Sequence, residues 1–156
     1  MKNHLLLLLF ALPAAALAQV PGTTKWEAIA QPLNKQGVSV VNLTAQIEKG
    51  WHIYALSQPP GGPIPLRIAV EPGTPYELAG NITGAIPQKH RDPSFNLETQ
   101  FYTDGFTLKV PVKVAPGAEA AVPLAVRFQM CSDTTCMPPK TVHLVATVTL
   151  PSALLK

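Results

Sequence analysis

The stretch RFQMCSDTTCMPPKTV (residues 127–142) contains the only two cysteines of the chain, Cys131 and Cys136. A strand-like run precedes the pair, and another, Thr141 to Leu150, follows it. We therefore expect the cysteines at or near the end of a hairpin that joins these two strands. In an oxidising compartment, such a close pair forms either a structural disulfide or a working redox couple.

The first residues predict export from the cytoplasm. Leu5 to Ala16 is almost unbroken apolar sequence, and Ala16-Leu17-Ala18 has the small-x-small pattern that signal peptidase cleaves. We expect a signal peptide over residues 1–18 and a single mature domain over residues 19–156; an uncleaved anchor is the alternative. The apolar run is shorter than the roughly 20 residues of a membrane span. After cleavage, no membrane span is expected.

Composition favours β-structure and argues against a nucleic-acid-binding role. The chain contains 17 prolines and 10 glycines, and proline suits turns and sheet edges rather than helix interiors. Loss of Lys2 with the leader leaves eleven basic residues against nine acidic ones, a formal charge of +2. The basic residues are scattered, with Lys89-His90-Arg91 the densest cluster, and we interpret them as a solvated surface.

Short strand-like segments follow one another along the mature chain. Val38 to Ile47 alternates with a period near two and is rich in β-branched residues, as half-buried strands are. Turn signals such as Asp104-Gly105 separate most of the remaining candidates, and no stretch shows a convincing helical repeat. The pattern predicts an all-β fold, an immunoglobulin-like β-sandwich. The other expected strands are Trp51–Tyr54, Leu66–Val70, Tyr76–Ala79, Phe106–Val114, Leu124–Met130 and Thr141–Leu150.

The cysteine spacing favours redox chemistry slightly over a structural bridge. A disulfide that closes so short a loop restricts the unfolded chain by only on the order of 2 kcal/mol. A reactive thiolate also needs access, which a loop at the end of a sheet provides. Cys131 continues an alternating strand and is expected to be the more buried sulfur. Cys136 precedes Met137-Pro138-Pro139 and is expected to be the more exposed one.

Three parts of the chain resemble one known family. The run Cys-x4-Cys-Met-Pro-Pro-Lys-Thr over Cys131–Thr141 is similar to the cysteine loop of the amino-terminal periplasmic domain of DsbD, the thiol:disulfide interchange protein. Residues 50–63 and residues 90–114 are similar to two further family segments and occur in the expected order. Together the three parts extend over about Val38 to Leu150.

This resemblance implies a periplasmic thiol:disulfide oxidoreductase of the electron-relay type. The family's immunoglobulin-like domain accepts electrons from one thioredoxin-like domain and passes them to periplasmic thioredoxin-fold partners, DsbC among them, a relay connected with cytochrome c biogenesis. Exchange proceeds through mixed disulfides. By resemblance, Cys136 bonds to partners and Cys131 resolves the intermediate. The resemblance implies no cofactor beyond the two cysteines, and no metal.

By the same resemblance, four residues cover or line the cysteine pair. Phe95 matches the aromatic residue of a cap loop that shields the cysteines until a partner displaces it; an ordinary core phenylalanine is the alternative. Asp92 and Tyr54 match lining positions, and a nearby carboxylate disfavours a thiolate. The alternatives are a turn residue before Pro93 and a half-buried strand residue. His52 stands where the best-known member carries a tyrosine, and its imidazole either tunes a thiol or belongs to the surface.

The sequence also departs from the family in extent. Full DsbD continues into a membrane-embedded electron-transfer region and a thioredoxin-like domain, whereas this sequence ends at Lys156. We therefore expect a stand-alone domain that receives electrons from a separate protein or has acquired another role.

Two other functions compete with the relay. One is a non-redox exported binding module with a structural disulfide, whose reduction potential would lie below the range of exchange catalysts. The other is a Cu(I) site, because thiolates and thioethers are ligands that suit this ion, although methionines fill gaps in a core equally well. The residues that would supply soft ligands are Cys131, Cys136, Met130, Met137 and His143.

Overall fold

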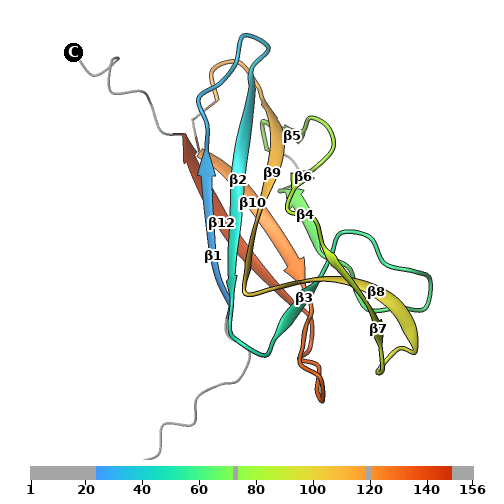
Figure 1. Ribbon diagram of the computed structural model, residues 1–156. Coiled ribbons are helices and arrows are strands. Elements are labelled where there is room, and N and C mark those ends of the chain that lie inside the picture. Colours follow the sequence, from blue (N-terminus) through green and yellow to red (C-terminus); the bar gives the residue numbers. More distant parts are fainter. Residues whose placement is uncertain (1–23, 72–73, 119–120, 149–156) are drawn as a thin grey trace, which may run out of the picture.

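A computed structural model describes residues 24–71, 74–118 and 121–148 (Figure 1). Every helix or strand assigned in these ranges is a β-strand, so the prediction of an all-β fold is confirmed. None of the described residues forms a helix that is long and apolar enough to cross a membrane. The predicted signal peptide lies outside the described residues and stays a prediction. The strands are β1 (Thr24–Ala30), β2 (Val38–Ile47), β3 (His52–Tyr54), β4 (Arg67–Val70), β5 (Tyr76–Leu78), β6 (Thr83–Gly84), β7 (Gln88–Asp92), β8 (Leu97–Thr103), β9 (Gly105–Val114), β10 (Ala121–Phe128), β11 (Met130–Cys131) and β12 (Lys140–Val148).

The strands form two sheets. The larger sheet has the order β4-β10-β12-β1-β2-β9-β5, and β6 pairs with β9 as well. Its edge strands β4 and β5 contact each other, so the sheet curls around its own apolar face. The smaller sheet has the order β11-β3-β8-β7. In Figure 1, β7 and β8 project to the lower right of the long strands β2, β9 and β10.

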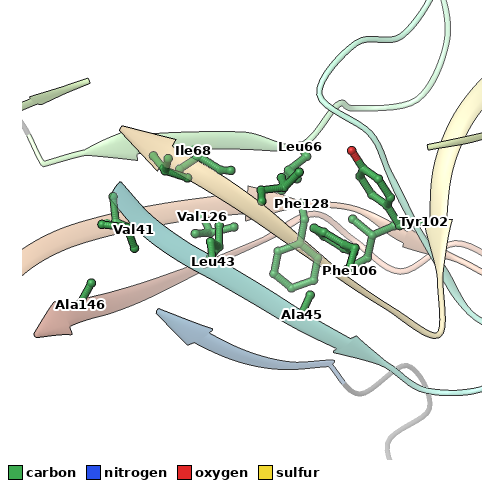
Figure 2. Close-up of a cluster of buried hydrophobic side chains, with 14 of the residues drawn as sticks. Val41, Leu43, Ala45, Leu66, Ile68, Tyr102, Phe106, Val126, Phe128 and Ala146 are labelled. Carbon is green, nitrogen blue, oxygen red and sulfur yellow. The ribbon is translucent and has the colours of Figure 1, made fainter. Parts of the chain in front are cut away.

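The core is built from the inward-facing residues of the alternating strands. β2 and β9 pair antiparallel, and Leu43 lies opposite Leu108 with both side chains buried. Successive strand residues point to opposite faces, so the period of two in β2 places every second residue in this core. Figure 2 shows the side chains of β2 and β9 meeting those of β4, β8, β10 and β12, among them Val41, Ala45, Ile68, Tyr102, Phe106, Val126, Phe128 and Ala146.

Several features of the fold differ from the sequence prediction, among them the strands β1 and β6, which were not predicted. The strand predicted at Leu124–Met130 is two strands in two sheets, because β10 ends at Phe128 and Met130 already pairs with Ile53 of β3. The hairpin of β7 and β8 was not predicted, although it carries several site residues. Four of the five residues of β7 are exposed, so this edge strand has no apolar alternation to detect.

Candidate functional site

A disulfide joins Cys131 and Cys136 at the end of the hairpin formed by β10 and β12. The ladder between these strands ends at the pair Phe128 and Lys140, and the cysteines lie beyond it. The predicted position at a hairpin end is therefore confirmed. The tip of the hairpin is also part of the smaller sheet, because β11 pairs with β3.

Backbone hydrogen bonds hold the two cysteines opposite each other. The N–H of Met137 donates to the carbonyl of Met130 at 2.8 Å, and the N–H of Ser132 donates to the carbonyl of Thr135 at 2.8 Å. The cysteine pair lies between these two bonds with its Cα atoms 4.0 Å apart. In antiparallel pairing this is the position where side chains approach most closely. None of these bonds involves sulfur, so we expect the hairpin tip to keep its shape after reduction.

The two sulfurs differ in exposure in the direction that the strand pattern predicts. Cys131 is 1% exposed, whereas Cys136 is half-buried. Met130 points to the opposite face of β11, where its side chain joins the hydrophobic core. Its Sδ accepts a hydrogen bond of 2.7 Å from the Thr24 hydroxyl. Met130 is therefore a core residue, and the described residues contain no group of three or more His, Cys, Asp or Glu that could hold a metal ion.

One face of the smaller sheet brings the predicted site residues together. Cys131 lies directly opposite His52, and Tyr54 lies directly opposite Phe101. Residues opposite each other in antiparallel strands point to the same face of the sheet. These four side chains therefore share one face, which we call the site face. The alternate positions Met130, Ile53 and Tyr102 point to the other face and belong to the core.

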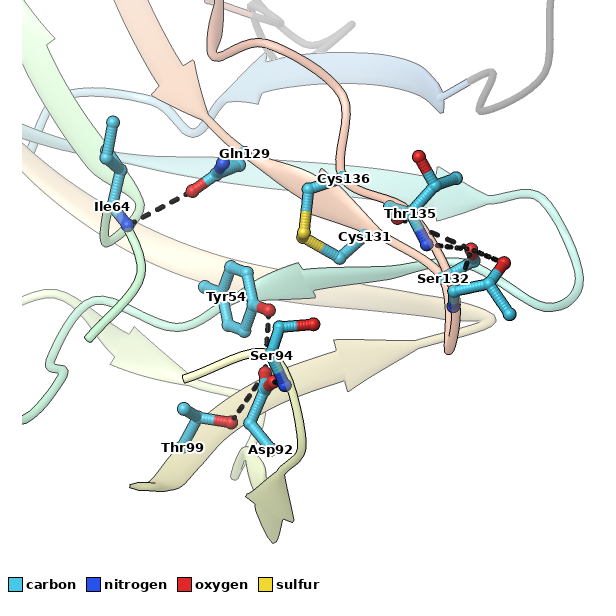
Figure 3. The surroundings of a disulfide bond; sticks show 11 residues. Tyr54, Ile64, Asp92, Ser94, Thr99, Gln129, Cys131, Ser132, Thr135 and Cys136 are labelled. Atoms are coloured by element: carbon cyan, nitrogen blue, oxygen red, sulfur yellow. Dashed lines mark hydrogen bonds between the residues drawn. A yellow bond between two sulfur atoms is a disulfide. The ribbon is translucent and has the colours of Figure 1, made fainter. Parts of the chain in front are cut away.

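Asp92 is fixed at the end of β7 by three hydrogen bonds (Figure 3). Its side chain is buried, and the Tyr54 hydroxyl donates to Oδ2 at 2.7 Å. The backbone N–H of Ser94 donates to Oδ1 at 2.9 Å, and the Thr99 hydroxyl donates to Oδ2 at 3.5 Å. The bond from Ser94 makes Asp92 a turn residue, and its role beside the cysteines stays a prediction.

Tyr54 serves as a permanent donor to this carboxylate. Burial first, and then the hydrogen bond to Asp92, raise the pKa of the Tyr54 phenol. The phenol therefore stays protonated over the whole neutral range. Its ring also carries the contact to Phe95, whose ring centroid lies 6.0 Å away in an edge-on arrangement. The half-buried Phe95 is not part of the described core cluster, and its action as a cap stays a prediction.

His52 lies between aromatic neighbours and is half-buried rather than on the open surface. Its ring centroid is 5.1 Å from that of Tyr54 and 4.9 Å from that of Phe101. Burial lowers the pKa of His52, while the negative charges of Asp92 and Asp133 act in the opposite direction. Its Nε2 atom is inaccessible to solvent and has no hydrogen-bond partner among the described residues.

A cleft of about 590 Å³ opens beside these residues. Its lining comes from the start of β3, from β7 and the loop after it, from β8 and from the cysteine loop, and includes His52, Asp92, Ser94, Phe101 and Asp133. The sequence did not identify Phe101 or Asp133 as site residues. The sequence did contain a signal for Phe101, because Phe101 precedes the core residue Tyr102 on the same strand and points to the opposite face of the sheet. Asp133 had none, because only the fold of the cysteine loop brings it to the cleft.

Comparison with known proteins identifies the family. Residues 20–147 match the family described as thiol:disulfide interchange protein DsbD, N-terminal. The chain belongs to this family. No curated sequence is significantly similar to the chain.

Solved structures of DsbD amino-terminal domains share the fold. The Neisseria meningitidis DsbD N-terminal domain in the reduced form has a TM-score of 0.54 at 16% identity, over 78% of this chain and 83% of that one. The same domain in complex with the PilB N-terminal domain has a TM-score of 0.54 at 15% identity, over 78% of this chain and 80% of that one. The N-terminal periplasmic domain of ScsB from Proteus mirabilis has a TM-score of 0.59 at 16% identity, over 80% of this chain and 46% of that one. The predicted family and immunoglobulin-like sandwich are confirmed, and family membership supports thiol–disulfide exchange at the cysteine pair.

The hydrogen bond from Tyr54 to Asp92 predicts a stability change. Tyr54→Phe removes one donor from a buried carboxylate, and we expect a loss of about 1–3 kcal/mol in the free energy of unfolding at pH 7. The folded protein favours the protonated phenol, so the contribution of Tyr54 is complete below pH about 10, the pKa of an exposed tyrosine, and is lost as the pH rises above it. Urea unfolding at pH 7 and pH 10.5 (about half a unit above that pKa) measures both effects.

The control for this prediction is the same substitution in an Asp92→Ala background, which has no acceptor for the hydroxyl. If the hydrogen bond carries the effect, Tyr54→Phe costs less there, and the double-mutant cycle shows the coupling. Equal losses in both backgrounds would mean that the bond to Asp92 does not carry the effect.

Proposed function

We propose that this domain exchanges thiols and disulfides in the periplasm and relays reducing equivalents between thioredoxin-fold proteins. The observation that carries the proposal is the asymmetric disulfide at a hairpin tip, with Cys131 buried and Cys136 half-buried in a loop whose Ser132 and Asp133 line a cleft. The family supports exchange chemistry. One structural neighbour is a complex between a DsbD N-terminal domain and a PilB N-terminal domain, which favours a protein partner for this chain too. The periplasmic ScsB domain favours the same compartment.

The proposed exchange uses the two sulfurs in order of their exposure. A donor thiolate attacks Sγ of Cys136, the Cys131–Cys136 bond breaks, and Cys131 leaves as a thiolate that takes up a proton. A second donor thiolate then attacks the donor sulfur of the mixed disulfide, which releases an oxidised donor and the reduced pair. Transfer to an acceptor disulfide runs through the same steps in reverse, so two electrons pass through the domain in each cycle.

The surroundings of the pair favour an unreactive resting state. Asp92 places a fixed carboxylate on the site side of the smaller sheet, and negative charge near a thiol disfavours its ionisation. Phe95 packs on Tyr54 in the loop between β7 and β8. We propose that this loop covers the pair until a partner moves it.

The competing role is a structural disulfide in a binding module. It is favoured by the hydrogen bonds of the tip and by the burial of Cys131, which would protect a permanent bridge. The relay and the structural bridge differ in one equilibrium property, the reduction potential of the pair.

We expect a reduction potential of roughly −180 to −270 mV, the range of exchange catalysts. Equilibration of the mature domain against defined thiol buffers, followed by alkylation and mass analysis, measures it. A value below about −300 mV would identify a structural bridge and contradict the relay.

Substitution of single cysteines tests the assigned roles. Cys131→Ser leaves Cys136 free to attack but removes the resolving thiol, so mixed disulfides with thioredoxin-fold proteins should accumulate. Cys136→Ser should capture almost none, because the remaining sulfur is buried. Non-reducing gels after incubation with an oxidised thioredoxin-fold protein give the comparison. Equal capture by the two variants would overturn the assignment.

Phe95→Ala tests the cap. In the reduced protein we expect Cys136 to react several-fold faster with iodoacetamide, because removal of the ring opens the path to the sulfur (activated thiols require access). Ile86→Ala is the control, since Ile86 is an exposed apolar residue outside the loop between β7 and β8. An unchanged rate for Phe95→Ala would leave Phe95 without a covering role.

A further inference from the structure

His52 occupies the position directly opposite the buried cysteine. In the ladder between β11 and β3, Cys131 pairs with His52, and both side chains point to the site face. Directly opposed residues of antiparallel strands have Cβ atoms about 4.5–5.5 Å apart. No other described residue is paired with Cys131 apart from its disulfide partner.

Aromatic contacts hold the imidazole of His52 in place, and its Nε2 atom makes no hydrogen bond to the described residues. Tyr54 lies edge-on to the ring at 82°, and Phe101 lies against it at 47°. Nε2 is buried and has no hydrogen-bond partner in the described part of the chain. A buried polar atom without a partner lowers stability, so packing alone does not account for a histidine here.

The groups that face His52 suit an imidazole that changes its charge transiently. Burial lowers the pKa of His52, and the neighbouring His90 of β7 acts in the same direction, so the ring is neutral at neutral pH. Asp92 at the end of β7 and Asp133 in the cysteine loop act in the opposite direction, because their charges favour the imidazolium. The ring is therefore ready to accept a proton, and the two carboxylates stabilise the product.

The other polar groups near the pair are either hydrogen-bonded or, like Asp133, exposed. The Asp92 carboxylate accepts hydrogen bonds from Tyr54, Ser94 and Thr99. The Tyr54 phenol donates to Asp92, and its raised pKa makes it a donor only. His90 is exposed on the edge strand. His52 is the one side chain of this group that is half-buried and has a buried ring nitrogen without a hydrogen-bond partner among the described residues.

We propose that His52 is the proton acceptor for Cys131 in the step that resolves mixed disulfides. This inference rests on the proposed function. When the partner is bonded to Cys136, the Cys131 thiol gives its proton to the imidazole, and the thiolate attacks Sγ of Cys136. The Cys131–Cys136 bond forms, the bond to the partner sulfur breaks, and the partner leaves as a thiolate that takes a proton from water. The imidazolium then returns its proton to solvent, and the pair has passed two electrons to the partner disulfide.

A two-phase reaction with 5,5′-dithiobis(2-nitrobenzoate) separates this step from the first attack. When the reduced protein meets one equivalent of reagent, attack by Cys136 releases one nitrothiobenzoate anion and forms a mixed disulfide. Attack by Cys131 then releases the other anion. Stopped-flow absorbance records both phases. Cys131→Ser, which shows only the first phase, identifies them.

We expect His52→Phe to slow the second phase about tenfold or more at pH 7, since positioned bases contribute on the order of 10²–10⁴-fold in enzymes. The first phase should stay within about twofold, because the attacking Cys136 is half-buried and not the sulfur that faces His52 (an accessible thiolate needs no positioned base). His52→Gln, which keeps polar character but is no base, should behave like His52→Phe. His52→Phe should unfold at the same or a higher temperature, because the phenyl ring removes an unpaired buried atom.

The pH profile distinguishes proton transfer from mere positioning. As the pH approaches the pKa of the thiol, hydroxide ionises Cys131 directly, and the wild-type and variant rates should converge. The second phase of the wild type should also become slower as the pH falls below the pKa of an ordinary histidine, about 6.5, because His52 then becomes protonated. The same ratio of rates at every pH, or no change in the second phase, would overturn the inference. Absence of both phases in the wild type would contradict the proposed function itself.

Discussion

The pairing of β11 with β3 is the constraint on which the site depends. After Phe128 the chain leaves the larger sheet, and Met130 and Cys131 pair with Ile53 and His52. The Gln129 side chain at the crossing accepts a hydrogen bond from the backbone N–H of Ile64. Because alternate residues of a strand point to opposite faces, one short ladder sends Met130 into the core and Cys131 to the site. The same β10–β12 hairpin that closes the core therefore delivers the reactive pair.

The site separates two requirements that conflict in a redox domain. The resting pair must resist chance oxidants and reductants, and it must still react when a partner arrives. Three hydrogen-bond donors hold the Asp92 carboxylate in a fixed position at the cleft. His52, with its free Nε2, is the part that remains available for chemistry.

The sequence was sufficient for the parts of the fold that alternate strongly. β2 and β9 were predicted almost to their ends, since each places every second residue in the core. The burial of Cys131 followed from the same periodicity, and the greater exposure of Cys136 followed from the prolines after it. The sequence failed for β7, an edge strand of exposed residues, and for the junction at Gln129, where one apolar run serves two sheets. The meeting of Asp92 with Tyr54 depends on how β3 and β8 pair, which no local pattern in either segment encodes.

The edge position of β7 has a consequence for how other proteins approach. Lys89, His90 and Arg91, the densest basic cluster of the sequence, all lie on this strand, and all three are exposed. Charged residues along an edge oppose the addition of a further strand from another chain. The domain thus discourages backbone-to-backbone adhesion at this edge of the smaller sheet, which lies opposite to the edge formed by β11. The charges on this edge strand therefore limit which polypeptides can approach, before any thiol takes part.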